Sequence, residues 1–467
     1  MWIALMAACD GPSDVAVDEP QDIVWGDPVT TLTRRIEPAP PIEPPLTANP
    51  SFADGLAEAE AAGLGGWSDA PGDPFVLRED LAPRGAQPDR RSLAFVFHQS
   101  DAQLADTESP TRLAAADAPG TTQSAARPQE LFAIHALDAL LRAANAVSVD
   151  HPIDFGIVSG DNADSAQQNE TDWFVSVWDG RTVHPDAGGD DAQPDDAVTV
   201  GVDDPIEAFD PEGAAFPWYT IAGNHDVLVQ GNFGIGSFED TALGAAAAGG
   251  TRDLSQPGGP LAFSTVADPG RVLLDRGELA QRYLASTSDP PGHGFTGDGT
   301  VTWTASPLAG LRLIGVDCNP SGIGDGELPA AQRDGFLIPA LDAARDAGEL
   351  VIVTSHYALG GRGIEGGGTV DALLAGWPNV VLSVVGHSHT NRIRPWGTFW
   401  EIETSSSVDW PGQGRLIELV DNGDGTLSIY ATLLDPLVPD GTLVARWRTL
   451  ALIDWQSGWL DSDGTGA

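Results

Sequence analysis

The chain has 467 residues, of which 68 are Asp or Glu and 23 are Arg or Lys, so its net charge is −45. Hydrophobic residues make up 42% of the sequence, enough to bury a sizeable core, which excludes a wholly disordered chain. Every basic residue is Arg, and the sequence lacks the basic patch of nucleic-acid-binding proteins, so no nucleic-acid partner is expected.

Residues 1–9 form a short apolar run that ends in Ala7, Ala8 and Cys9 and resembles a bacterial lipoprotein signal. In such a signal the cysteine receives the lipid, so the resemblance implies an exported protein, anchored at the cell surface or in the periplasm. The run is shorter than the usual apolar region of about 7–15 residues and has no preceding basic residue, so a chance apolar start is the alternative. Apart from such an anchor, no contact with a membrane is expected.

Residues 10–50 hold nine of the 36 prolines of the chain. Proline fixes φ and removes a backbone donor, so this segment is predicted to form neither helix nor sheet and to act as an extended tether. Residues 51–90, rich in Ala and Gly, lead from the tether to a folded domain at 91–435. Three tryptophans predict that the extension at 436–467 is a helix packed on that domain. The sequence indicates no oligomeric state.

From residue 91 onward, short apolar runs alternate with amphipathic helical patterns, which predicts a mixed α/β core. Strands are predicted at 93–98, 154–158, 217–222, 311–316, 350–354, 380–385, 399–403, 415–420 and 427–433. Helices are predicted at 128–147 and 329–347. His98 is expected to be a core residue, whereas His135 and Asp138 are expected to face solvent.

Five of the predicted strands end in polar side chains, and in open α/β sheets ligands bind at the carboxyl ends of strands. The residues are Asp101, Gln103, Asp161, Asn162, Asn224, His225, His356, His387 and His389. Carboxylates, carboxamides and imidazoles without a thiolate suit Mn²⁺, Fe²⁺, Fe³⁺ or Zn²⁺. They are too many for one tetrahedral zinc, so their number favours two divalent metal ions.

A single His in a sequence is more often a structural residue than a metal ligand. The order in which these polar strand ends follow one another along the chain is nevertheless specific. Over roughly residues 92–435 the chain resembles the calcineurin-like metallophosphoesterase family. The motifs of that family run Asp-x-His, Gly-Asp, Gly-Asn-His-Asp/Glu, a lone His and Gly-His-x-His. The resemblance implies a four-layer sandwich of two mixed β-sheets flanked by helices. It also implies hydrolysis of a small phosphomonoester or phosphodiester by a hydroxide that bridges the two ions.

The resemblance also implies a role for each matching position. Asp161 would bridge the two metal ions. One ion would be completed by Asp101, Gln103 and His389. The other ion would be completed by Asn224, His356 and His387. His225, which is not a ligand, would act on the phosphoryl oxygen or the leaving group. Asp226 is expected to be a second catalytic residue. Asn162 and His293 are expected to contact substrate.

Gln103 stands where the family has a histidine. A carboxamide oxygen is a weaker ligand than an imidazole, so Gln103 is expected to coordinate weakly, to hold a water or to leave one metal loose. The segments 99–112, 160–167 and 406–415 resemble a bacterial, often secreted, branch of the family, which implies that Gln103 belongs to a branch pattern. The alternative function is a cell-surface protein of this fold that binds metal or a phospho-ligand with little or no catalysis.

The acidic composition leads to a prediction about stability. Two compatible explanations of the acidic composition are a GC-rich coding sequence and a surface adapted to salt or to an extracellular setting. In each case the folded protein carries charges that repel one another, and added salt screens this repulsion. The melting temperature should therefore rise with NaCl concentration. Thermal unfolding at low and high NaCl measures this, and a flat or falling Tm would contradict it.

Overall fold

The computed structural model describes residues 23–40, 46–83, 85, 89–119, 122–187, 205–256, 258–297, 299–319 and 326–457. Cys9 lies outside these residues, so lipid attachment and export remain predictions.

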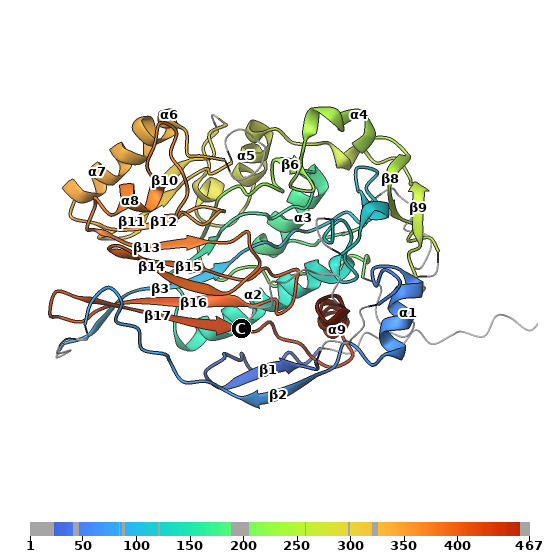
Figure 1. Ribbon diagram of the computed structural model, residues 1–467, viewed down its shortest axis with the longest axis horizontal. Coiled ribbons are helices and arrows are strands. Elements are labelled where there is room, and N and C mark those ends of the chain that lie inside the picture. The colour runs from blue at the N-terminus through green and yellow to red at the C-terminus, as the bar shows by residue number, and fades with distance from the viewer. Residues whose placement is uncertain are drawn as a thin grey trace, which may run out of the picture.

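Two mixed β-sheets stacked on one another form the centre of the domain (Figure 1). The first has the order β10 (Trp303–Leu308), β11 (Leu311–Gly315), β12 (Leu350–Thr354), β13 (Val380–Val385), β15 (Phe399–Glu403) and β14 (Arg392–Trp396). The second has the order β17 (Leu427–Leu434), β16 (Gly414–Asp421), β3 (Arg91–Gln99), β4 (Phe155–Val158) and β5 (Trp218–Thr220). Strands β11, β12, β13 and β15 are parallel in the first sheet, as are β3, β4 and β5 in the second. The carboxyl ends of these parallel strands carry the predicted site residues.

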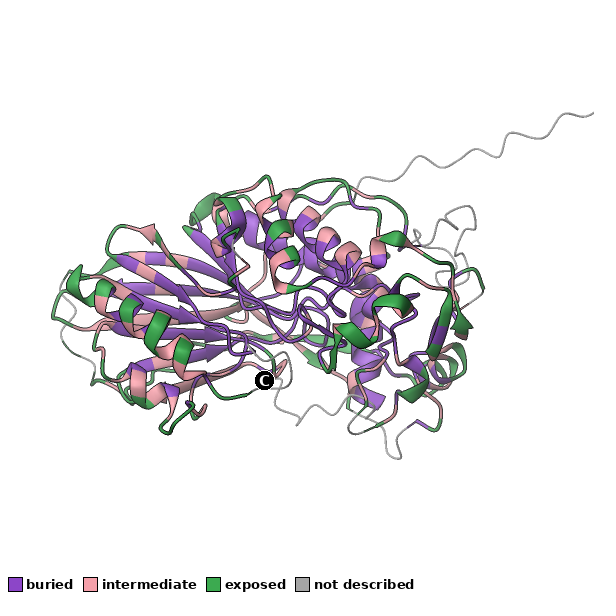
Figure 2. Cartoon of the chain, turned by 90° about the horizontal axis from the view of Figure 1, so that it is seen from above, coloured by how far each residue is buried: buried purple, intermediate pink, exposed green. Residues whose placement is uncertain are grey.

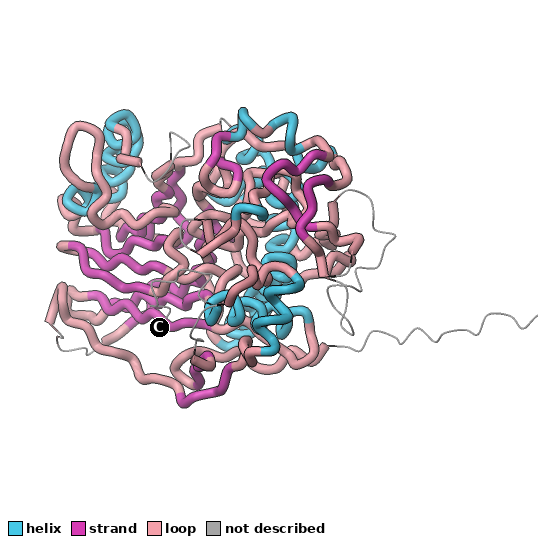
Figure 3. The backbone as a smooth tube through the Cα atoms, turned by 45° about the vertical axis from the view of Figure 1, so that its right-hand side comes forward, coloured by secondary structure: helices cyan, strands magenta, loops and turns pink. Residues whose placement is uncertain are grey.

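The main core lies between the two sheets, whose strands lie one above another in two views (Figures 1 and 3). Leu313 and Ile352 of the six-stranded sheet pack in one cluster with Val96 of the five-stranded sheet. The alternate side chains of β12, Val351 and Val353, are buried on the opposite face. Burial on both faces explains why these strands are continuous apolar runs in the sequence. Buried residues accordingly fill the centre of the molecule, and exposed residues lie on the outer helices and loops (Figure 2).

Helices flank both sheets. The outer face of the six-stranded sheet is covered by α6 (Ala330–Gln332), a π-helical turn (Arg333–Leu337), α7 (Ile338–Asp346) and α8 (Val370–Leu374). The five-stranded sheet packs against α2 (Ala133–Asp150) and α3 (Gln168–Asp179). The stretch Glu130–Asp150 is long and apolar enough to cross a membrane, but 72% of its apolar 18-residue window is buried inside the fold, as in a core helix. The predicted mixed α/β fold of two mixed sheets flanked by helices is confirmed.

A long insertion connects β5 to β10. It consists of β6 (Leu228–Val229), β7 (Phe233–Gly234), α4 (Glu239–Ala242), β8 (Ala246–Arg252), β9 (Leu261–Ser264) and α5 (Arg276–Leu284). Its first turn reaches the carboxyl end of β5, because a Cβ placed on Gly231 would lie 2.4 Å from the His225 ring.

The prediction that residues 10–50 form no helix or sheet is wrong for one part of the segment. Strand β1 (Arg34–Pro38) pairs antiparallel with β2 (Trp67–Pro71), and helix α1 (Ala53–Ala61) lies between them in the chain. Pro38 and Pro71 are the last residues of a two-stranded sheet, where a missing N–H is tolerated. Helix α1 packs against the C-terminal helix α9 (Leu443–Ser457), which lies where the tryptophans predict a helix.

His135 and Asp138 do not face solvent, contrary to the prediction. His135 is buried, stacks near Phe209 and contacts the carbonyl oxygen of Pro205 through Nε2 at 2.9 Å. Asp138 is also buried and accepts from Arg142 at 2.8 Å. The segment that covers them follows residue 204 and folds back over α2, which helical periodicity cannot indicate.

Candidate metal centre

The structure brings all seven predicted metal ligands together at the carboxyl ends of five strands. The oxygen ligands follow β3, β4 and β5 of the five-stranded sheet, and they are Asp101, Gln103, Asp161 and Asn224. The imidazoles follow β12 and β13 of the six-stranded sheet, and they are His356, His387 and His389. The centre therefore lies where the two sheets meet.

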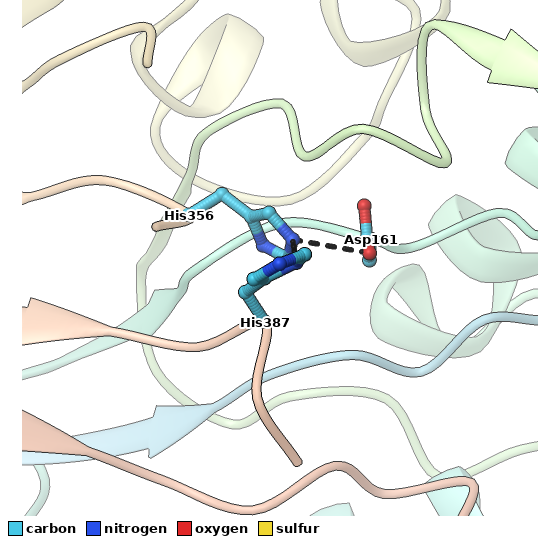
Figure 4. Close-up of side chains that lie close together, drawn as sticks. All are labelled: Asp161, His356 and His387. Carbon is cyan, nitrogen blue, oxygen red and sulfur yellow. Dashed lines mark hydrogen bonds and ion pairs between the residues drawn. The ribbon is translucent and has the colours of Figure 1, made fainter. Parts of the chain in front are cut away.

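His356 is in the middle of one half of the centre. Its Nε2 lies 3.1 Å from Asp161 Oδ2, 3.0 Å from Asn224 Oδ1 and 3.2 Å from His387 Nδ1. Figure 4 shows the side chains of Asp161, His356 and His387 converging. Their ligand atoms all lie within 4.8 Å of one another, close enough to bind a single ion.

Asp101, Gln103 and His389 form the other half. His389 Nε2 lies 3.4 Å from Asp101 Oδ1 and 3.3 Å from Gln103 Nε2, and Gln103 Nε2 is also 3.3 Å from Asp161 Oδ2. Asp161 thus contacts both halves, as a bridging ligand must.

The backbone of the centre is in an uncommon conformation. Among the described residues, eight non-glycine residues have positive φ, and five of them are predicted ligands: Asp101, Gln103, Asp161, His387 and His389. L-residues rarely adopt this region, and such conformations concentrate at functional sites. Gly386 shows how closely the loops approach, because a Cβ there would lie 1.8 Å from Ser100 Oγ.

The pKa shifts of the histidines indicate that the carboxylates of the centre favour positive charge there. Burial alone would lower the pKa of His356, but the Asp161 and Asp101 carboxylates outweigh it and raise that pKa to about 9. In the same way, Asp101 and Asp409 outweigh burial and raise the pKa of His389 to about 10. Burial and the charge of His356 lower the pKa of His387 to about 3. A bound divalent ion would replace the protons on His356 and His389.

Two buried acceptor atoms support the same interpretation. Gln103 Oε1 has no hydrogen-bond partner among the described residues, and Asp101 Oδ1 has only ion-pair contacts there, with His389 Nε2 at 3.4 Å and His356 Nε2 at 3.9 Å. Buried polar groups without partners are costly, and a metal ion is one way to satisfy them. The donor set of carboxylate, carboxamide and imidazole fits a hard or borderline divalent ion.

His225 lies beside the metal centre, and both its backbone N–H and its ring Nδ1 make contacts with acidic residues. Its backbone N–H donates to Asp161 Oδ1 at 2.8 Å, while its Nδ1 lies 2.8 Å from the Asp164 carbonyl oxygen and 3.3 Å from Asp164 Oδ1. Asp164 is in turn paired with buried Arg112 at 3.0 Å. Burial lowers the pKa of His225, but Asp161 and Asp164 outweigh it, so the pKa is raised.

The structure gives Asp226 a role in holding the fold, and its expected catalytic role stays a prediction. Its carboxylate is buried and accepts four backbone N–H groups, from Asp161, Asn162, Ala163 and Gly223, at 2.8–3.1 Å. Asp226 therefore fixes the loop that carries Asp161 to the loop that carries Asn224. Adjacency to His225 in the sequence does not reveal that the side chain points toward the backbone.

The two predicted substrate contacts, Asn162 and His293, are both buried, and their contact with substrate stays a prediction. Asn162 is buried, and its amide donates to Thr220 Oγ1 at 3.1 Å and Tyr283 Oη at 2.6 Å. His293 is fully buried and stacks on Trp218 with ring centroids 3.5 Å apart. Both side chains are thus held by contacts within the fold.

Two residues that the predictions omit, Asp164 and Asp409, contact the outer nitrogens of His225 and His389. Asp164 lies within the segment 160–167 and Asp409 within the segment 406–415. The resemblance of these two segments to a branch of the family is the sequence signal that could have pointed to the two aspartates.

The presence of a carboxamide at position 103 leads to a prediction about metal affinity. Replacing Gln103 with His should strengthen the binding of one of two metal ions, because an imidazole is the better ligand. Ligand changes of this kind commonly alter affinity about 10–100-fold. Titration of the metal-free wild-type protein should show two unequal steps, with activity following the weaker one. In Gln103→His the weak step should tighten, and half-maximal activity should need less metal. If both steps and the metal dependence stay the same, Gln103 does not bind metal.

Neither family models nor curated proteins match this chain. Several solved structures resemble it. A dimetal phosphatase from Danio rerio aligns with a TM-score of 0.36 and 12% identity over 74% of this chain and 100% of its own. A putative 5'-nucleotidase from Staphylococcus aureus aligns with a TM-score of 0.34 and 13% identity over 79% and 59%. A calcineurin-like phosphoesterase from Bacillus subtilis aligns with a TM-score of 0.30 and 12% identity over 78% and 97%.

The arrangement in this chain itself is the one expected from the motifs. Two mixed sheets are flanked by helices, and the five motif-bearing loops meet at one edge, with Asp161 between the two halves of the ligand set. The chain thus has the mixed α/β fold of two stacked sheets flanked by helices that the motif resemblance implies.

Proposed function

We propose that the protein is a metal-dependent phosphoesterase that hydrolyses a small phosphomonoester or phosphodiester. The observation that carries this proposal is the convergence of four oxygen ligands and three imidazoles at one point, with Asp161 between two subsets. The buried Gln103 Oε1, which has no hydrogen-bond partner among the described residues, supports it, since a metal ion is one way to satisfy such an acceptor.

The ligand set divides into two. Asp161, Asn224, His356 and His387 would hold one ion, and Asp101, Gln103, Asp161 and His389 would hold the other. When bound, divalent ions neutralise phosphoryl oxygens and make a nucleophilic water available at neutral pH. Mn²⁺, Fe and Zn²⁺ all suit these donors.

His225 would act as the general acid. Its Nδ1 is occupied by Asp164, which leaves Nε2 to donate a proton to the leaving oxygen. The raised pKa favours the protonated ring. General acid catalysis of this kind contributes about 10²–10⁴-fold.

A second candidate function is metal or phospho-ligand binding without turnover, which Gln103 favours because it weakens one half of the centre. The two are separated by a screen of p-nitrophenyl phosphate and bis-p-nitrophenyl phosphate against Mn²⁺, Fe²⁺ and Zn²⁺. Turnover by wild type that is lost in Asn224→Ala supports the enzyme. Metal binding in the wild type without turnover of either ester supports the binding protein.

A further inference from the structure

His389 presents its two ring nitrogens to different partners. Nε2 faces the candidate metal centre, 3.4 Å from Asp101 Oδ1, whereas Nδ1 lies 2.5 Å from Asp409 Oδ2. A carboxylate that accepts from the outer nitrogen of an imidazole fixes the tautomer and the ring orientation, and it makes the inner nitrogen a stronger ligand.

Asp409 is itself held in place. It lies in the loop after β15 and is 1% exposed. Its Oδ1 accepts from Gln129 Nε2 at 2.9 Å and lies 3.1 Å from Arg127 Nε. Its backbone N–H donates to Ser406 Oγ at 2.9 Å. The carboxylate therefore cannot turn away from His389 without breaking several buried contacts.

Among the described residues, the other two ligand imidazoles, His356 and His387, have no acidic side chain behind them. His356 Nδ1 lies 2.9 Å from the carbonyl oxygen of Ser159, a neutral acceptor, and His387 Nδ1 faces His356. His389 is thus the ligand backed by an acidic side chain, and it belongs to the same half of the centre as the weaker ligand Gln103.

We propose that Asp409 is a positioning residue that strengthens His389 as a metal ligand and so offsets the weak carboxamide of Gln103. The proposal rests on the metal centre of the proposed function. It assigns Asp409 no contact with substrate, because the carboxylate lies on the far side of the His389 ring.

Asp409→Asn tests this role, because Asn has the same shape but no charge. Co²⁺ is titrated into the metal-free full chain by calorimetry, and its visible absorption spectrum is recorded. One of the two binding steps should weaken about 10–100-fold, and the absorption of that Co²⁺ should change, while the other step stays the same.

Asp454→Asn is the matched control. Asp454 is 1% exposed and accepts from the same Gln129 amide at 3.1 Å, but it does not contact His389. Burial and Asp409 raise the pKa of Asp454 well above its ordinary range, and Asn keeps the shape of the Asp454 side chain. Both Co²⁺ steps and the spectrum should match the wild type.

Either of two results would overturn the proposal: unchanged steps and spectrum in Asp409→Asn, or equal weakening in Asp454→Asn, which would indicate general loosening of the core. Turnover of p-nitrophenyl phosphate by the same wild-type preparation tests the proposed function separately. If wild type binds two Co²⁺ ions without turnover, the phosphoesterase assignment fails, and a weakened step in Asp409→Asn still supports the positioning role. If wild type binds no Co²⁺, both fail.

Discussion

His225→Ala should lower turnover about 100-fold or more, because the variant loses the group that protonates the leaving oxygen. Its metal content should stay close to that of the wild type, since the imidazole is held by Asp164 and is not placed as a ligand. Steady-state kinetics with p-nitrophenyl phosphate, combined with elemental analysis of the same samples, measures both quantities.

His151→Ala is the control for this experiment. His151 is exposed and follows α2 on the amino-terminal side of β4, whereas the site lies at the carboxyl end of that strand, so neither turnover nor metal content should change. Parallel loss of metal and activity in His225→Ala would show that His225 is a ligand, and the assigned role would be wrong.

Asp226→Ala should destabilise the protein strongly, because four buried backbone N–H groups would lose their acceptor at once. An unsatisfied buried group costs about 1–3 kcal/mol, and partial relaxation of the loop makes about 3–5 kcal/mol a reasonable total. Urea unfolding of metal-free protein measures the free energy of unfolding. Metal binding should weaken as well, since the freed loop carries Asp161.

Asp226→Asn retains one oxygen acceptor and should fall between wild type and Asp226→Ala. Asp240→Ala, in the exposed first turn of α4, is the control and should change the free energy of unfolding by less than about 1 kcal/mol. A loss in Asp226→Ala no larger than in this control would mean that the four contacts do not hold the loops.

The residues at the strand ends could be predicted because the strands themselves are easily recognised in the sequence. The predicted bounds of β12 and β13 match the observed Leu350–Thr354 and Val380–Val385, since both strands are buried on two faces and read as continuous apolar runs. Parallel strands place their carboxyl ends at one edge, so the polar residues after them could be grouped before the fold was known.

The supporting residues were not predictable in the same way. Asp409 follows a predicted strand, 399–403, but only the sheet order shows that β15 lies beside β13 and directs the next loop toward His389. The orientation of Asp226 and the stacking of His293 on Trp218 depend on side-chain direction within a loop, for which hydrophobic periodicity gives no information.

The division of the ligands between the sheets has a mechanical consequence. All candidate oxygen ligands come from one sheet and all imidazoles from the other, so neither sheet alone contains a complete site. An ion held by both sets would fasten the two layers together at their edge, in addition to the apolar packing between them. Because a ligand that binds only the assembled state stabilises that state, metal supply would control how firmly the layers stay joined. The ligand atoms would then serve the reaction and also hold the two sheets together.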